Sequence, residues 1–512
     1  MPHHRRRALA GAVPLLAALC ALPSFAMPSA ASTALKFDKN VTVYQGDYGE
    51  PGLSVDGANV YVTTPGDGGA VWALSRNGGR SFTKKPTVRP PADQQRGAAP
   101  GSDSDVAVGE DGAVYVGDLT IDGIEVSRST DGGETFPQRV FLDTDLSADR
   151  EWLWVDGKGD EAIVYVAWHE LATGTMLVKR STDAGKTFDA VPHVVYTNPQ
   201  TGVESAHNGS SIGQITSDGK GHVYVVYGIT RADTLTGATP PVIPISKIVM
   251  SVSDDYGVTW QDITVNPGYA DANYGNFWMA AAVDKGGTVY VTYSGRNHDA
   301  TEPMRVFLQA SKDFGRTWTE EYVVSPEGGN SLFGWVAGGR AGDAVVSWYH
   351  TDSDNKDAAD AQWVVQVAHV TGLADGTPVR RLGTASDHVM HEGGICTFGI
   401  LCGVVPGTSD DRSLLDFFKV ATTADGLAAV VFSDNGEDRH DVTFAKEVPT
   451  AVTPPTGTGG TGGGSGSGTG GSGGSGSGGS GMPATGTDAG LLALAAGACL
   501  VAAAAVRRRA TR

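Results

Sequence analysis

The sequence predicts an all-β fold of about seven small antiparallel sheets arranged in a ring, because two short motifs recur along it. The first motif is an octet of the form Ser-x-Asp-x-Gly-x-Thr-aromatic. We call the following five segments the octets, the first of them a degenerate copy: Ser75–Phe82, Ser129–Phe136, Ser181–Phe188, Ser253–Trp260 and Ser311–Trp318. In each octet the Asp can accept hydrogen bonds within a turn, the Gly can adopt a positive φ, and the aromatic residue can pack on a sheet.

The second motif is an apolar strand, a short Asp/Gly turn and a strand that reads like Val-Tyr-Val. Five strong copies and two weaker ones, the last two below, occur in order: Val60–Val62, Val114–Val116, Val164–Val166, Val223–Val225, Val289–Val291, Val345–Ser347 and Ala429–Val431. β-Branched and aromatic residues between turn residues are typical of strands. The repeats therefore predict a single β-propeller of about seven four-stranded blades over residues 33–450, with six blades as the alternative.

The N-terminal segment is expected to close the ring. The last blade has only three strands of its own, which are predicted at Leu414–Thr422, Leu427–Ser433 and Asp441–Glu447. The segment Asn40–Gln45 alternates like a strand and is predicted to supply the missing outer strand. Closure of this kind removes a sheet edge that would otherwise pair with other chains.

The octets resemble the Asp-box, or BNR, repeats of sialidases and related propellers. The resemblance implies that each octet lies on the hairpin between the third and fourth strands of a blade, on the face opposite an active site. We therefore interpret the octet residues Asp131, Asp183, Asp255 and Asp313 as structural turn clamps and not as catalytic groups.

The N-terminus has the pattern of a secretory signal peptide. Arg5–Arg7 precede an apolar stretch from Ala8 to Leu22, and a region of small residues follows. We expect residues 1–32 to be cleaved on export, by the general route or by a twin-Arg route.

The C-terminus has three parts. Residues 451–481 are almost entirely Gly, Ser and Thr and are predicted to form a flexible linker. Residues 482–512 contain Met482–Gly486 (MPATG), the uncharged span Ala489–Val506 and a basic tail. This end resembles a sortase sorting signal of the Leu-Pro-x-Thr-Gly type, which implies cleavage between Thr485 and Gly486 and transfer to peptidoglycan. Sortase and peptidoglycan are thus expected partners on a Gram-positive surface, with a plain C-terminal transmembrane helix as the alternative.

Charge and cysteine usage agree with export. The net charge is −19, and removal of both signals, with seven arginines and one aspartate, would make it −25. Such an acidic chain is a poor partner for nucleic acid. Cys396 and Cys402 would be the cysteines of the mature chain, and we expect them to form a disulfide. A metal site with the nearby His388, His391 and Glu392 is the alternative.

The candidate functional residues lie where the inner strands begin, because these positions converge on one face of a propeller, here called the entry face. The candidate ligand-binding or catalytic set is Glu50, Asp103, Asp105, Asp149, Arg150, Glu151, Arg296, Asp411 and Arg412. The insertions Ile229–Ser246 and Ser386–Arg412 are expected on the same face. Clustered carboxylates make calcium a candidate cofactor, and ion-paired loop residues are the alternative.

The sequence leaves two function classes open. Resemblance to sialidases implies an arginine triad, a Tyr nucleophile and an Asp acid/base. The first arginine of that family lies near the start of blade one, where this chain reads Tyr48-Gly49-Glu50-Pro51. The catalytic residues are therefore unassigned. We expect a surface module that binds a glycan or protein ligand, and the alternative is a glycoside hydrolase with diverged catalytic residues.

Overall fold

The computed structural model describes residues 34–449, except 47–48, 67–68, 87, 89–100, 121–122, 144–147, 171–174, 197–203, 207–211, 232–244, 270, 276–277, 299–301, 398–401, 403–408 and 437–439. The predicted signal peptide, linker and sorting signal, with Thr485 and Gly486, lie outside the described residues. So does most of the insertion Ile229–Ser246. Among the described residues no helix is long and apolar enough to cross a membrane, and the span Ala489–Val506 is not among them.

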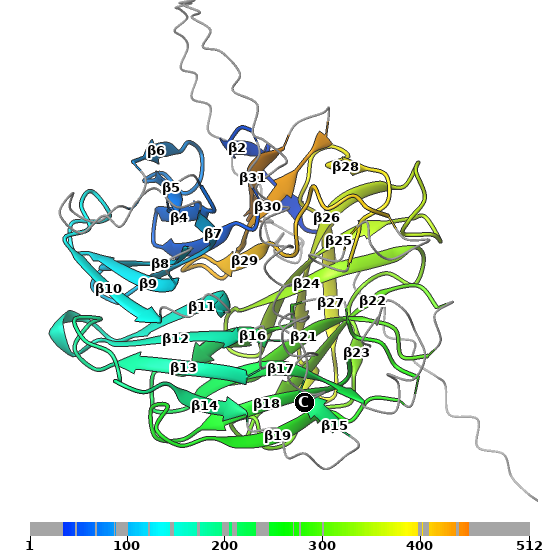
Figure 1. The fold of residues 1–512 in the computed structure, drawn as a ribbon. Coiled ribbons are helices and arrows are strands. Elements are labelled where there is room, and N and C mark those ends of the chain that lie inside the picture. Colours follow the sequence, from blue (N-terminus) through cyan, green and yellow to red (C-terminus); the bar gives the residue numbers. More distant parts are fainter. Residues whose placement is uncertain are drawn as a thin grey trace, which may run out of the picture. The chain divides into compact units, whose positions relative to one another are not determined.

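The described residues form seven antiparallel sheets, each a blade of a β-propeller (Figure 1). From the axis outward, blade one consists of β3 (Gly52–Asp56), β4 (Asn59–Thr64), β5 (Val71–Ser75) and β6 (Thr83–Lys85). Blade two consists of β7 (Gly101–Val108), β8 (Val114–Thr120), β9 (Gly123–Ser129) and β10 (Gln138–Asp143). Blade three consists of β11 (Ala148–Asp156), β12 (Ile163–Glu170), β13 (Thr175–Ser181) and β14 (His193–Tyr196). A short 3-10 turn, η1 (Gly159–Glu161), connects β11 to β12.

Blades four to six follow the same order, with small additions. In blade four, β15 (Glu204–Ala206) and β16 (Ile212–Ser217) both pair with β17 (Val223–Arg231), and β18 (Ile245–Ser253) and β19 (Gln261–Asn266) follow. Blade five consists of β20 (Ala280–Val283), β21 (Val289–Gly295), β22 (Arg305–Ser311) and β23 (Tyr322–Val323). Blade six consists of β24 (Asn330–Gly338), β25 (Asp343–Thr351), β26 (Gln362–Thr371) and β27 (Val379–Thr384); β28 (His391–Glu392) also pairs with β26, and the 3-10 turn η3 (Leu373–Asp375) follows β26. Each inner strand contacts the inner strand of the next blade, and β29 of blade seven returns to β3, which closes the ring.

Blade seven confirms the predicted closure by the N-terminus. Its own strands are β29 (Lys419–Thr422), β30 (Ala428–Asp434) and β31 (Asp441–Val448), and its outer positions are filled by β1 (Lys36–Phe37) and β2 (Val41–Tyr44). Val41 lies opposite Phe444 in the register. The six-bladed alternative is therefore wrong. The inner strand is shorter than predicted, because Leu415 has a φ of 56° and the segment before Lys419 turns instead of pairing.

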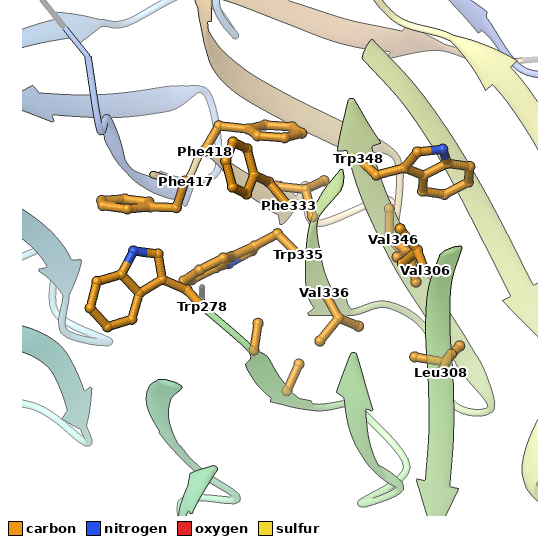
Figure 2. Packing of buried hydrophobic residues seen from close by; sticks show 14 of the residues in the cluster. Trp278, Val306, Leu308, Phe333, Trp335, Val336, Val346, Trp348, Phe417 and Phe418 are labelled. Atoms are coloured by element: carbon orange, nitrogen blue, oxygen red, sulfur yellow. The ribbon is translucent and has the colours of Figure 1, made fainter. Parts of the chain in front are cut away.

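The Val-Tyr-Val strands form the buried middle of the blades. Their tyrosines are at most 1% exposed and pack between neighbouring sheets: Tyr61, Tyr115, Tyr165, Tyr224 and Tyr290. The centre of the ring is filled by Trp152, Trp278, Trp335 and Phe417, three of which are seen together in Figure 2. Trp152 is 5.0 Å from Trp335 and 5.3 Å from Phe417 between ring centroids. These aromatic rings form an apolar floor beneath the entry face.

Each octet joins the third and fourth strands of a blade, as in Ser181–Phe188 between β13 and β14. Within this octet the Ser181 hydroxyl accepts a bond from the Gly185 N–H at 2.8 Å. The Asp183 carboxylate accepts bonds from the Thr187 N–H at 2.9 Å and the Thr187 hydroxyl at 2.6 Å. Because the third strand runs parallel to the first, the octets lie at the opposite end of the blades from the entry face. We call this end the octet face.

Candidate functional site

The inner strands begin with irregular backbone. The pairing register shifts near the start of β7, β11, β16 and β24, which is the signature of β-bulges. Glu50, Arg150 and Phe333 have φ values of 48°, 47° and 56° at these entries. A left-handed φ costs a residue with a side chain on the order of 1–2 kcal/mol. Strain of this kind, repeated at one face, marks the entry face as a candidate functional site.

Arg150 is the centre of the site. Its side chain is 1% exposed and lies between two rings, with the guanidinium carbon 3.8 Å from the Trp152 ring centroid and 4.1 Å from that of Phe417. Its Nη1 is 3.7 Å from the Asp103 carboxylate and donates to the Ser104 carbonyl at 3.4 Å. One arginine thus connects blades two, three and seven, and both cation–π contacts hold it in place.

Glu50 and Asp103 form a hydrogen-bonded pair of carboxyl groups. Burial, the charge of Asp103 and the hydrogen bond with it raise the pKa of Glu50 well above its ordinary value. Burial raises the pKa of Asp103 to about 6, against the opposing effect of the Arg150 charge. Both carboxyl groups therefore hold a proton more readily than an isolated carboxyl group would.

Arg412 and Asp416 border this pair. The Arg412 guanidinium bonds the Asp416 carboxylate and lies 3.8 Å from the Glu50 carboxylate. The Arg412 side chain is 24% exposed, whereas those of Glu50 and Asp416 are 9% and 8% exposed. Arg412 is thus the guanidinium that an incoming ligand meets first.

Asp149 forms the third side of the site. Its carboxylate is 3.3 Å from His169 Nε2, and the His169 ring stacks at 5.9 Å on Trp278. Burial alone would raise the pKa of Asp149, but the His169 hydrogen bond and the charges of His169 and Arg150 bring it below its ordinary value. Asp149 is therefore an ionised, partly exposed acceptor next to a neighbour, Asp103, whose pKa is raised.

Two predicted residues lie beneath the entry face and not on it. Asp105 is fully buried, and its carboxylate accepts bonds from Lys419 Nζ at 2.6 Å and from the Leu153 N–H at 3.1 Å. Glu151 is also fully buried, and burial raises its pKa well above the ordinary value. The register shifts lie beside these residues, between Gly101 and Asp103 in β7 and between Asp149 and Trp152 in β11. We therefore correct their place: these two carboxyl groups belong to the interior.

Two other predicted residues lie in different surroundings. Asp411 lies in the insertion Ser386–Arg412, where its carbonyl accepts the Cys396 N–H at 2.8 Å and its carboxylate accepts the Ser413 N–H at 2.8 Å. Arg296 pairs its backbone with Asn273 in an isolated bridge beside blade five. The structure thus brings together Glu50, Asp103, Asp149, Arg150 and Arg412 out of the predicted set.

The predicted disulfide is confirmed, with the Cα atoms of Cys396 and Cys402 5.9 Å apart. The nearby histidines have other partners. His391 Nδ1 is 2.6 Å from the Asn435 side-chain oxygen, and His388 contacts Asp387 at 2.9 Å and Asp434 at 3.1 Å. Within the described part of the chain, no group of three or more His, Cys, Asp or Glu side chains is arranged to hold a metal ion. Among these residues the candidate cofactor calcium therefore has no ligand set.

Sequence reasoning missed Lys419, Asp416, Phe417 and Trp278. The segment Asp416–Lys419 (DFFK) opens an apolar strand with charged residues on both sides of two aromatics, which was the available signal. Burial lowers the pKa of Lys419, and its Nζ lies 5.0 Å from the Trp152 ring centroid as well as on Asp105. This ion pair fixes blade seven to blade two directly below the entry face.

Fold and site together define a seven-bladed β-propeller with a charged site of cross-blade contacts at its entry face. No protein-family model matches the sequence, and no curated protein matches it. Among solved structures, a protein of unknown function from Dyadobacter fermentans is similar with a TM-score of 0.43 and 13% identity, covering 81% of this chain and 100% of that one. A NanB sialidase from Streptococcus pneumoniae is similar with a TM-score of 0.40 and 10% identity, covering 80% and 70%.

A fucose-specific lectin from Aleuria aurantia is also similar, with a TM-score of 0.37 and 13% identity, covering 68% of this chain and 98% of that one. All three scores are below 0.5. The fold assignment therefore depends on the strand order and register of this chain itself.

Proposed function

We propose that this protein is a secreted, cell-wall-anchored propeller that binds a carbohydrate through its entry face. The observation that supports this function is the cluster of Glu50, Asp103, Asp149, Arg150 and Arg412, which unites residues at the entries of four different inner strands. Carboxylate acceptors and guanidinium donors lie side by side above an aromatic floor. Sugar hydroxyls both donate and accept hydrogen bonds, so such an alternation suits them.

The Glu50–Asp103 pair favours binding over glycoside hydrolysis. A hydrogen bond between the two carboxyl groups contributes to the pKa of each. Retaining glycosidases separate their carboxyl groups by roughly 5 Å, and inverting enzymes separate them further. A pair in direct contact leaves no space for a glycosidic bond between its members, whereas it can present a fixed donor and acceptor to one ligand.

A surface glycoside hydrolase is the second candidate, because Asp103 and Asp149 have opposite pKa shifts. The pKa of Asp103 is about 6, and that of Asp149 is below its ordinary value. Opposite shifts in neighbouring carboxyl groups are the pattern of an acid and its base partner. In this reading Asp103 would protonate the leaving oxygen and Asp149 would activate water or attack the sugar.

Substitutions at Asp103 and Asp149 test both candidate functions. The full chain is applied to an array of immobilised glycans, and hydrolysis of the glycans it binds is followed by mass spectrometry. We expect binding without hydrolysis, and we expect Asp103→Asn with Asp149→Asn to abolish binding. Asp183→Ala on the octet face is the matched control and should bind normally. If the parent chain hydrolyses a glycan and Asp149→Asn does not, the protein is a glycoside hydrolase and the binding proposal is wrong.

The proposed anchoring has its own test. The mature chain should be released from cells by muramidase and should end at Thr485. Extraction by detergent alone, with the C-terminal Arg512 still present, would show a membrane anchor in place of sortase attachment.

A further inference from the structure

The fourth position of every octet has a left-handed backbone, whatever residue occupies it. Gly78 and Gly132 have φ values of 72° at this position, and Ala184, Tyr256 and Phe314 have values of 62°, 59° and 60°. Glycine adopts this conformation without penalty, whereas a residue with a side chain loses on the order of 1–2 kcal/mol. The octets of blades four and five therefore carry aromatic residues where the turn itself favours glycine.

These two aromatic residues are only partly buried. Tyr256 is 43% exposed and Phe314 is 41% exposed, and Val258 in the same octet as Tyr256 is 42% exposed. In the part of the chain that the structure describes, eight large hydrophobic residues are exposed, and three of them are in these two octets. Backbone strain combined with exposure indicates that the rings serve contact with something outside the fold.

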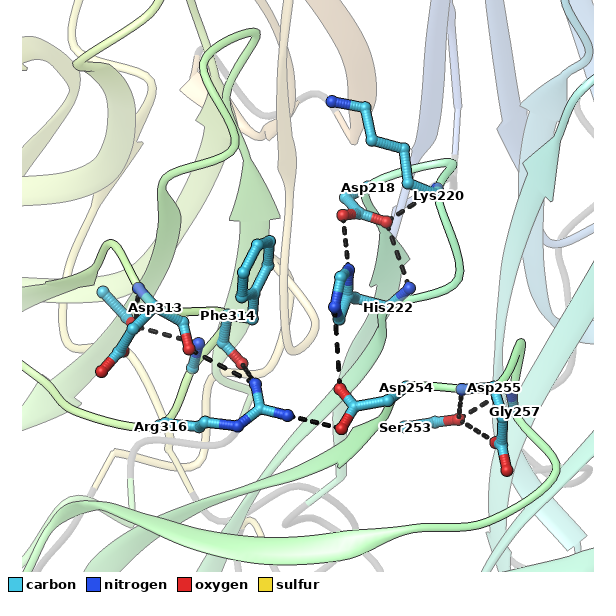
Figure 3. Close-up of polar contacts among 12 residues, drawn as sticks. Asp218, Lys220, His222, Ser253, Asp254, Asp255, Gly257, Asp313, Phe314 and Arg316 are labelled. Atoms are coloured by element: carbon cyan, nitrogen blue, oxygen red, sulfur yellow. Dashed lines mark hydrogen bonds and ion pairs between the residues drawn. The ribbon is translucent and has the colours of Figure 1, made fainter.

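Both rings lie beside the turn that joins β16 to β17. The Phe314 ring stacks on His222, with centroids 4.1 Å apart and planes inclined by 12°. The Tyr256 ring lies next to Gly221. A Cβ atom added to Gly221 would be 3.3 Å from Cε2 of Tyr256. His222 is held by Asp218 at 2.7 Å and lies 3.7 Å from Asp254 (Figure 3). The two rings and this turn form one surface, called here the octet patch.

Charged groups border the octet patch. Arg316 pairs with Asp254, and their side chains are 41% and 52% exposed. Arg180 also donates to the Tyr256 carbonyl at 3.0 Å. A flat apolar ring bordered by carboxylate acceptors and guanidinium donors fits a pyranose, whose C–H face packs on the ring while its hydroxyls bond to the rim.

The topology indicates which saccharide is close at hand. β31 is the third strand of its blade, so it ends at Val448 on the octet face. Phe444 of β31 packs on Phe82 of the first octet at 5.3 Å, which places both at this face. The predicted linker to the wall begins three residues after Val448. A tethered surface meets its own anchoring polymer at high effective concentration, and the net charge of −19 disfavours anionic polymers.

We propose that the octet patch of Tyr256, His222 and Phe314 binds neutral glycan strands of the cell wall. This inference adds a second saccharide site to the entry face and depends on the proposed wall anchoring for its biological setting. It gives the octets of blades four and five a binding role that the octets of blades one to three do not have.

The test measures cosedimentation of the full chain, produced in a host without sortase, with purified sacculi freed of protein and anionic polymers. The variant Tyr256→Gly with Phe314→Gly removes both rings and relieves the backbone. We expect about a tenfold loss of sacculus binding, as for the loss of two aromatic contacts, with no fall in thermal stability. Ala184→Gly makes the same backbone change in blade three without removing a ring, and should bind like the parent chain.

Unchanged sedimentation of the double variant would overturn the proposal, and so would a lower melting temperature, since that would make the rings structural. If the glycine variants do not fold, Asn at both positions, which also tolerates a left-handed φ, gives the same readout. The variant Asp103→Asn with Asp149→Asn should still bind sacculi. Loss of sacculus binding in that variant would show that the entry face, and not the octet patch, binds the sacculi. Release of the protein from cells by detergent would contradict only the proposed wall anchoring.

Discussion

The two faces of the propeller are built from different kinds of contact. At the entry face and directly beneath it, the contacts join distant parts of the chain, such as Lys419 with Asp105 below the face, which are 314 residues apart. At the octet face they are local, since Asp183 bonds Ser181 and Thr187 within four residues, and the arrangement recurs in other blades. A change at the entry face therefore leaves a charge of another blade without its partner, whereas a change in one octet loosens one hairpin.

The largest effect is expected from Lys419→Met. The Asp105 carboxylate is fully buried, and without Lys419 it would be an uncompensated buried charge. Removal of one partner of a buried ion pair costs about 3–5 kcal/mol. Urea unfolding should show this loss, and Lys419→Met combined with Asp105→Leu should recover much of it. Equal losses in the single and double variants would contradict an ion pair that acts as a unit.

A smaller effect, with a characteristic pH dependence, is expected from His369→Asn. His369 lies at the octet end of the sheets, with Nδ1 2.9 Å from Asp343 and Nε2 2.8 Å from Glu447. Burial alone would lower its pKa, but the hydrogen bonds and charges of these carboxylates raise it to about 9. Compared with the ordinary value of 6.5, the raised pKa corresponds to about 3 kcal/mol of stability.

The sign of this dependence follows from the raised pKa. The stabilisation is fully present below about pH 6.5, and it is lost as the pH rises through 9. Melting temperatures of the parent chain and His369→Asn should therefore converge between pH 7 and pH 10. A difference that stays constant over this range would mean that His369 is not charged in the fold.

Loss of one octet clamp should cost less. Asp183→Ala removes an acceptor of three hydrogen bonds and should lower the free energy of unfolding by about 1–2 kcal/mol, as for a lost helix cap. Asp183→Asn should retain most of the stability, because Asn77 fills this position in the first octet and bonds the Ser81 N–H at 3.1 Å. Denaturant titration of both variants measures these losses. If Asp183→Asn lost as much unfolding free energy as Asp183→Ala, the hydrogen bonds of the side-chain oxygen would not be the source of the stability.

The smallest effect is expected from an exposed ion pair of the same chemistry as Lys419–Asp105. Lys312 bonds Asp375 with both side chains more than half exposed. Surface pairs contribute about 0–1 kcal/mol, so Lys312→Ala should change the unfolding free energy by less than about 0.5 kcal/mol. Measured beside Lys419→Met, it separates the effect of burial from that of charge pairing. A loss as large as that of Lys419→Met would show that burial is not the cause.

The fold could be predicted because its signals are local. The octets and the Val-Tyr-Val strands each lie within eight consecutive residues, and the missing strand of blade seven was visible as Asn40–Gln45. The site was predicted in part, because strand entries were known to converge but bulges were not visible. The register of β11 shifts between Asp149 and Trp152, at Arg150 and Glu151, and no residue type in this segment signals that shift. Lys419 was missed because its partner, Asp105, lies in another blade, and no spacing in the sequence connects them.

The closure of blade seven determines the order in which the protein can fold. β1 and β2 are the first described strands to be synthesised, and both pair with β31, the last; Val41 of β2, for example, lies opposite Phe444. Pairs this distant in sequence form slowly, because most of the chain must already be compact. Six blades can form in succession while the seventh waits, and during that interval the ring has two unpaired edges. Proteases and other copies of the chain have access to those edges until β2 and β31 meet.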